Sequence, residues 1–118
     1  MASTPPLPIH CTATGAKLVA LMTAEGICHR FIAAFARAQG APASASTSKP
    51  ANGLVVELRF LPQGVAMASV TPIKADTPAP MQRFEMAVSD RAFTPGDIDR
   101  LAVDAATGLR PTSRRQRR

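Results

Sequence analysis

Two cysteines, each beside a histidine, are the residues of this sequence with the most specific chemistry. Cys11 follows His10, and Cys28 precedes His29. Together they supply the ligand types of a Cys₂His₂ zinc site, and a cysteine with a histidine can also act as a nucleophile. Adjacent residues point to opposite faces of a strand or lie about 100° apart around a helix, so neither pair converges on one atom. We therefore expect no catalytic, cofactor-binding or metal-binding residues.

Two alternatives remain for Cys11 and Cys28, a disulfide bond or two buried free thiols. A bridge would join the first strand to the first helix, and closing a loop of that size is worth about 3 kcal/mol in the chain-entropy model. Free cysteine is among the most buried residue types, and Cys28 lies on the apolar side of its helix. Both alternatives predict that the two residues come close together. A Cα separation above about 7 Å would exclude an unstrained bridge.

The positive charge of the chain is concentrated at its C-terminus. Five of the 14 basic residues lie in the last nine positions, which leaves nine basic against eight acidic side chains in residues 1–109. Such a tail could bind phosphates or acidic surfaces through charge alone. The alternative, and the commoner case, is a solvated terminus that aids solubility. The candidate anion-binding residues are Arg110, Arg114, Arg115, Arg117 and Arg118.

Helix signals mark two segments of the chain, and the first of them contains Cys28. Thr23 is a suitable N-cap for a first helix that buries Ile27, Phe31 and Phe35 and ends at Gly40. Thr94-Pro95-Gly96-Asp97 predicts a capped second helix that ends near Gly108. Along that helix the spacing of its charges predicts local pairs of Asp97 with Arg100 and of Arg100 with Asp104.

Strand signals surround these helices. Residues 9–14 predict a weak first strand, and period-two alternation predicts strands over 54–60, 65–71 and 84–88. The order β(weak)-α-β-β-β-α predicts an α+β two-layer sandwich, an antiparallel sheet of three to four strands with two helices on one face. We expect one domain over 9–109 with a flexible loop at 41–53, a disordered Pro-rich segment at 1–8 and a flexible basic tail at 110–118.

The outer face of the sheet is a candidate interaction surface. Pairing across a Pro62-Gln63 turn would place small and apolar side chains from three strands on the face away from the helices. Such a face could pack on a protein partner or on a second copy. The alternative is that its alanines reflect only the alanine-rich composition of the chain. Its residues would be Val55, Ala66, Ala68, Val70 and Ala87.

One segment carries a resemblance. Residues 84–101 read Phe-Glu-Met-Ala-Val-Ser-Asp-Arg-Ala-Phe-Thr-Pro-Gly-Asp-Ile-Asp-Arg-Leu. This stretch resembles the C-terminal half of small exported proteins of uncharacterised function in Gram-negative bacteria, and Cys11 and Cys28 are similar to a cysteine pair in such proteins. The resemblance implies no active residues. As it stands the sequence predicts a cytoplasmic protein, and a periplasmic or secreted one if the cysteines are bonded and a signal peptide was removed.

These observations favour a non-enzymatic binding or protein-interaction module. No apolar run approaches the roughly 20 residues that span a bilayer, so we expect no membrane insertion. The alternative is a nucleic-acid-associated protein that uses the arginine tail. The element order is similar to that of double-stranded-RNA-binding domains, but Asp97 and Asp99 stand where those domains place lysines, and their charge would repel phosphate.

Overall fold

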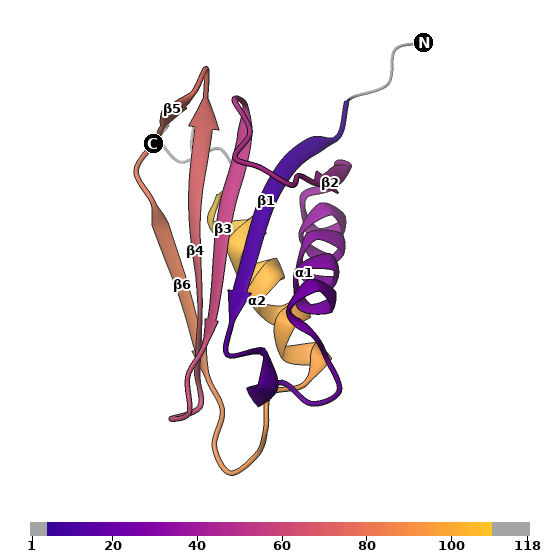
Figure 1. The fold of residues 1–118 in the computed structure, drawn as a ribbon, viewed down its shortest axis with the longest axis vertical. Helices are drawn as coiled ribbons and strands as arrows, with labels where there is room; N and C mark the ends of the chain where they lie inside the picture. The colour runs from indigo at the N-terminus through magenta and orange to yellow at the C-terminus, as the bar shows by residue number, and fades with distance from the viewer. Residues whose placement is uncertain (1–4, 110–118) are drawn as a thin grey trace, which may run out of the picture.

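A mixed sheet of six strands lies against two helices in the computed structural model, which describes residues 5–109 (Figure 1). The α+β class and the position of both helices on one face of the sheet are confirmed. The strands are β1 (Leu7–Thr14), β2 (Ala43–Ala45), β3 (Gly53–Phe60), β4 (Val65–Lys74), β5 (Thr77–Pro78) and β6 (Gln82–Ala87). The helices are α1 (Ala24–Gln39), α2 (Pro95–Gly108) and the short 3-10 helix η1 (Ala16–Leu18).

Both helices begin at the predicted caps. The Thr23 hydroxyl accepts a hydrogen bond from the Gly26 N–H, 3.0 Å away, and α1 ends at Gly40, whose φ of 73° suits a residue without a Cβ. At α2, Thr94 and Asp97 form the predicted capping box, and the Thr94 N–H donates to the Asp97 carboxylate at 2.9 Å. Local side chain to backbone hydrogen bonds therefore fix both starts.

The helix α2 ends at Gly108, as predicted, but the expected role of this glycine as a left-handed stop is wrong. Gly108 belongs to the helix, Leu109 is the cap residue, and Gly108 is not among the residues with a positive φ. A Cβ at Gly108 would overlap the ring of Phe84 on β6. This glycine therefore lets a helix and a strand approach closely and does not supply a left-handed cap.

We expected an antiparallel sheet, but the sheet is mixed. Its order is β2-β1-β3-β4, with β6 and β5 both pairing with β4 at the opposite edge. β1 runs parallel to β3 because α1 carries the chain back to the end of the sheet where β1 began. β3, β4 and β6 then form the expected antiparallel meander.

The hydrophobic core lies between the sheet and the two helices. Both helices run in the same direction, since Arg30 meets Asp99 near their starts and the Gln39 side chain donates to the Ala106 carbonyl near their ends. The predicted helical stripes are buried on this side. The largest fully buried side chains are Phe31, Phe35, Ile9, Ile27, Leu58, Ile98, Leu101, Val56 and Val70.

The register between β3 and β4 contradicts part of the predicted interaction face. Three residues, 62–64, separate Leu61 from Val65, and the Leu61 N–H donates to the Val65 carbonyl at 2.9 Å. Gly64 completes the turn with a φ of 89°, which adds one residue to the expected two-residue loop. A shift of one residue exchanges the two faces of a strand. Three of the five proposed face residues, Ala66, Ala68 and Val70, are therefore fully buried in the core.

Two segments expected to lack structure form parts of the sheet. β1 begins at Leu7, inside the segment predicted to be disordered. The Leu7 N–H donates to the Pro42 carbonyl at 3.0 Å. β2 lies inside the predicted flexible loop and pairs with residues 7–9. Neither segment has much apolar surface of its own, so pairing between residues distant in sequence decides their conformation.

Candidate functional site

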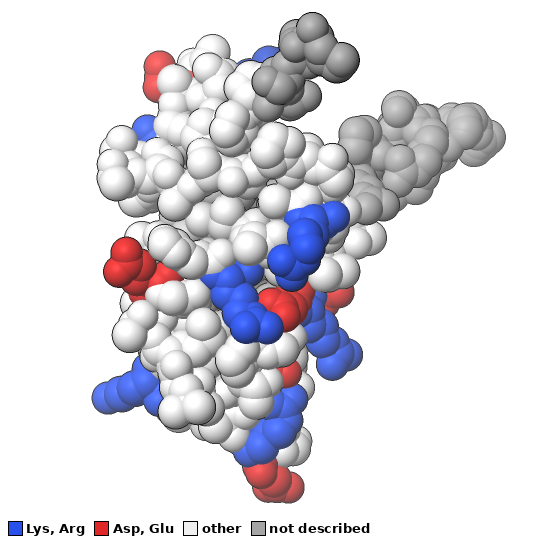
Figure 2. Space-filling model, turned by 90° about the vertical axis from the view of Figure 1, so that its right-hand side faces the viewer, with Lys and Arg blue, Asp and Glu red and all other residues white. Residues whose placement is uncertain are grey.

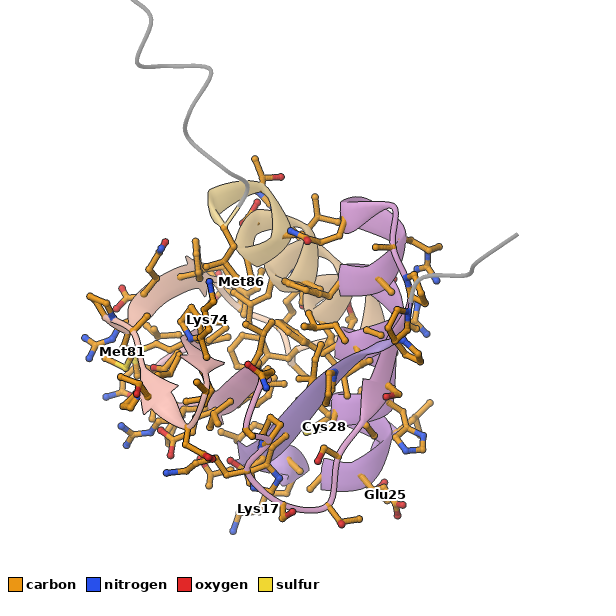
Figure 3. The ribbon with its side chains drawn as sticks, turned by 90° about the horizontal axis from the view of Figure 1, so that it is seen from above. Lys17, Glu25, Cys28, Lys74, Met81 and Met86 are labelled. Carbon is orange, nitrogen blue, oxygen red and sulfur yellow. A yellow bond between two sulfur atoms is a disulfide. The ribbon has the colours of Figure 1, made fainter. Side chains whose placement is uncertain are left out.

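A disulfide bond joins β1 to the beginning of α1. Cys11 lies on the side of β1 that faces the helices, and Cys28 lies at the start of the buried stripe of α1, where Figure 3 shows it beside β1. Their Cα atoms are 5.8 Å apart, so the expectation that they come close is confirmed. Because both sulfur atoms are bonded, neither thiol is available as a metal ligand or a nucleophile.

The two histidines lie apart from one another. The His10 ring nitrogen Nδ1 is 3.1 Å from the Ser46 carbonyl oxygen, whereas His29 is exposed on α1. Within residues 5–109, no group of three or more His, Cys, Asp or Glu could hold a metal ion. The arrangement therefore gives the histidines no shared chemistry.

The edge of β1 is covered by β2 over only its first three residues. The last contact is a hydrogen bond from the Ser46 N–H to the Ile9 carbonyl, 2.8 Å long. The chain then turns away to the outer face of the sheet, where Ser46 meets His10 and the Asn52 side chain accepts a hydrogen bond from the Ala75 N–H. Beyond Ile9, no described residue pairs with this edge of β1.

Backbone hydrogen-bonding groups of β1 point out at this uncovered edge. The Leu7 N–H and the Ile9 carbonyl both bond toward β2. Because a strand alternates the direction of its hydrogen-bonding groups, Cys11 and Ala13 present their N–H and carbonyl groups on the same side. By the same alternation, Thr12 between them directs its N–H and carbonyl groups toward β3, with which this part of β1 pairs. The edge therefore offers two donors and two acceptors over Cys11 and Ala13.

A groove of about 470 Å³ lies against this edge, between β1 and the first half of α1. The disulfide and Ile32 contribute apolar surface, and Ser46 and Thr47 contribute hydroxyl groups. Glu25 is the one charged side chain among the lining residues, and Figure 3 shows it directed away from the fold. The lining residues are Cys11, Thr12, Ala13, Ala24, Glu25, Cys28, His29, Ile32, Ala45, Ser46 and Thr47.

Figure 2 views the molecule from the side of β1, β2 and α1. Lys, Arg, Asp and Glu side chains gather across the middle and lower part of this side, and most of the surface above them is uncharged. The middle and lower group therefore has both signs of charge side by side.

Two acidic side chains of α2, Asp97 and Asp99, make ion pairs with arginines further away in the sequence than the predicted partner. Asp97 accepts from Arg91 at 2.7 and 2.9 Å, and Asp99 accepts from Arg30 with two bonds of 2.8 Å. In each case the hydrogen bonds from arginine hold the pKa of the carboxyl below its ordinary value. The predicted pairs of Arg100 with Asp97 and with Asp104 are not formed among the described residues, and Asp97 is bonded to Arg91 instead. The two ion pairs therefore connect α2 to α1 and to the segment that precedes α2.

The remaining predicted residues divide between the outer face and the tail. Val55 and Ala87 lie on the outer face of the sheet, as expected. Ala66, Ala68 and Val70 lie on the opposite face, in the core. The five tail arginines lie outside the described residues. The groove residues Ala13, Ala24 and Ser46 were not predicted. No sequence signal pointed to them, because residues 41–53 read as a flexible loop and the short strand β2 inside it has no apolar alternation of its own.

Among the described residues, no helix is long and apolar enough to cross a membrane. Comparison of the sequence with protein families and with curated proteins gives no match to any family model or to any curated protein.

Proposed function

We propose that this protein is a binding module that takes an extended peptide segment of a protein partner along the uncovered edge of β1. The observation that carries the proposal is the position of the outward-pointing backbone groups of Cys11 and Ala13 directly against the groove. An extended chain that adds to a sheet edge gains main-chain hydrogen bonds, and adjacent pockets select its side chains.

The dimensions of the edge define the bound segment. Residues 11–14 of β1 span roughly 13 Å at about 3.3 Å per residue, which matches three to four residues of an added strand. Alternate side chains of that strand would point toward the groove, where Ile32 and the disulfide favour a small or medium apolar group. Hydroxyl groups of Ser46 and Thr47 would meet a polar residue at one end. We therefore expect an uncharged or mildly cationic segment, because Glu25 is the one charge nearby.

The disulfide supports the proposal that this module functions in an oxidising compartment. Disulfides persist in the periplasm and outside cells, and they are rare where thiols are kept reduced. The cysteine pair is also one of the two features that carry the resemblance to exported proteins, the other being residues 84–101. A periplasmic or secreted protein partner would then supply the extended segment.

The nucleic-acid alternative depends on the tail alone. Residues 5–109 carry nine basic and eight acidic side chains. Arg30 and Arg91 are already neutralised by Asp99 and Asp97. Binding to phosphates through charge needs a cluster of uncompensated cations. We therefore expect removal of residues 110–118 to leave peptide binding unchanged and to abolish any salt-sensitive binding to nucleic acid.

Peptide display gives the direct test. Twelve-residue random peptides are selected on the full oxidised chain, and the enriched peptides are titrated by calorimetry against wild type and two proline variants. Ala13→Pro removes an N–H that points out of the β1 edge and leaves the ladder to β3 in place. Ala87→Pro is the matched control, since it makes the same change on the opposite edge of the sheet.

The proposal expects enriched peptides that bind wild type and Ala87→Pro alike and bind Ala13→Pro at least about tenfold more weakly. Amide exchange of Cys11 and Ala13 should slow in the complex, while that of Thr12 changes little. A circular dichroism spectrum and a melting curve show whether Ala13→Pro is folded. Peptides that bind Ala13→Pro as well as wild type, or no enriched peptide at all, would overturn the proposal.

A further inference from the structure

The opposite edge of the sheet, formed by β6, is also uncovered, and it has different chemistry. β6 pairs with β4 on one side, and within the described residues no strand pairs with its other side. It forms the left-hand border of the sheet in Figure 1. We propose that a second copy of this chain pairs here, with the two β6 strands antiparallel about a two-fold axis at Phe84.

The hydrogen-bonding direction of β6 identifies the available groups. The Val88 N–H donates to the Gly64 carbonyl at 2.8 Å, so even-numbered residues of this strand bond toward β4. By alternation, Arg83, Glu85 and Ala87 present their N–H and carbonyl groups at the uncovered edge. Two copies can exchange hydrogen bonds only if these odd-numbered residues face one another.

Charge selects one register from those that the hydrogen bonds allow. An axis at Arg83 would place this arginine opposite its own copy, and an axis at Glu85 would place two glutamates opposite one another. An axis at Phe84 places Arg83 opposite Glu85 of the second copy, and the symmetry repeats this pair. Opposite charges at facing positions stabilise a strand pair and like charges destabilise it. Axes further along the strand leave both charges without a partner and shorten the pairing.

The side chains around this edge are available for such a contact. Arg83 and Glu85 are exposed, and neither has an ion-pair partner among the described residues. On the helix side of the strand, Phe84 and Met86 are only half-buried. Met81 is 50% exposed, and Figure 3 shows it at the outer border of the sheet.

The same axis at Phe84 brings these apolar groups together. Phe84 would face Phe84 of the second copy on the helix side, and Met81 would face Ala87 on the outer face. Pairing would therefore remove apolar surface from water on both faces of the sheet and form two ion pairs on the outer face. Proteins commonly protect uncovered edges with charges, and here the spacing of two opposite charges makes the edge complementary to itself.

Charge reversal tests the register. Sedimentation of the full oxidised chain is measured from 1 to 500 µM for wild type, Arg83→Glu, Glu85→Arg and the double variant with both changes. Each single variant places like charges opposite one another at both symmetric positions, so its dimer should be roughly tenfold weaker or more. The double variant restores both ion pairs with exchanged partners and should recover the dimer.

A mixture of the two single variants provides a second measurement. Arg83→Glu carries two acidic side chains on this edge and Glu85→Arg carries two basic ones, so an equimolar mixture should form a heterodimer although neither variant dimerises well alone. Arg59→Glu, a charge reversal on the same face but on β3, is the matched control and should dimerise as wild type does. A wild type that stays monomeric at every concentration overturns the proposal. So do single variants that dimerise normally, or a double variant and a mixture that do not recover.

Discussion

The two uncovered edges of the sheet offer the same backbone groups in different surroundings. At β1 the edge lies beside a groove, α1 stands behind it, and a disulfide fixes the distance between strand and helix. At β6 no described residue pairs with the edge, and Arg83 and Glu85 stand two residues apart on its outer face. Side chains therefore give one edge space for the alternate residues of a foreign strand and give the other a charge pattern that matches its own copy.

The origin of each edge also differs. β1 is uncovered because the chain after Ser46 crosses to the outer face, whereas β6 is uncovered because α2 follows it and packs on the inner face instead. The first edge depends on a covalent link and the second on packing between Phe84 and Gly108. Perturbing these two supports should affect the two edges separately.

Loss of the disulfide should have the largest effect. With Cys11→Ala and Cys28→Ala together, we expect the free energy of unfolding to fall by about 3 kcal/mol, since the bridge closes a loop with a sequence separation of 17. Amides of β1 and of the first turns of α1 should exchange faster than those of β4. Denaturant unfolding and hydrogen exchange measure the two effects.

Reduction of the wild type gives the control for that prediction. A reduced wild type and the double alanine variant should lose similar stability, and both should lose affinity for peptides while the β6 contact between copies persists. A reduced protein as stable as the oxidised one would show that the β1 edge does not depend on the bridge.

Adding a Cβ at Gly108 should have the next largest effect, on the β6 side. Gly108→Ala forces the Phe84 ring away from α2, and we expect a loss of about 1–2 kcal/mol in thermal or denaturant unfolding. Gly96→Ala is the matched control, because a Cβ there would lie 3.7 Å from the nearest atom, the Thr94 Oγ1. If the two variants are equally stable, close packing of α2 on β6 does not hold that edge.

Replacing Asp97 with asparagine should have a smaller effect, which depends on pH. The hydrogen bonds from Arg91 and from Thr94 lower the pKa of this carboxyl in the folded protein. Its stabilisation is therefore complete above the ordinary pKa of aspartate and is lost as the pH falls through the lower folded value. At neutral pH, Asp97→Asn should cost about 1 kcal/mol through the weakened cap. Below about pH 4 the difference from wild type should shrink.

Asp99→Asn provides the comparison for that variant and should have the smallest effect. Its partner Arg30 is exposed, and an ion pair at the surface is weakened by solvent and salt. It links α1 to α2, so its loss should affect both edges equally. Unfolding curves at pH 3 and pH 7 measure both variants. A larger loss for Asp99→Asn than for Asp97→Asn would reverse the order proposed here.

The sequence determined the local elements of this protein. Thr23 and Thr94 set the starts of both helices, Gly40 ended the first, and the period-two pattern of residues 54–60 gave a strand with one buried face. These features could be predicted because each depends on hydrogen bonds, dihedral angles or side-chain directions within a few residues. The proximity of Cys11 to Cys28 followed once β1 and α1 were expected to pack together.

Only the tertiary structure decided which residues meet across the sheet. One additional residue in the turn at Gly64 moved Ala66, Ala68 and Val70 from the expected outer face into the core. The parallel pairing of β1 with β3 depends on where α1 returns the chain. The groove depends on where β2 ends and the chain leaves the edge. A strand's pattern specifies that it will pair, but its partner, register and uncovered length depend on the summed packing of segments far apart in the chain.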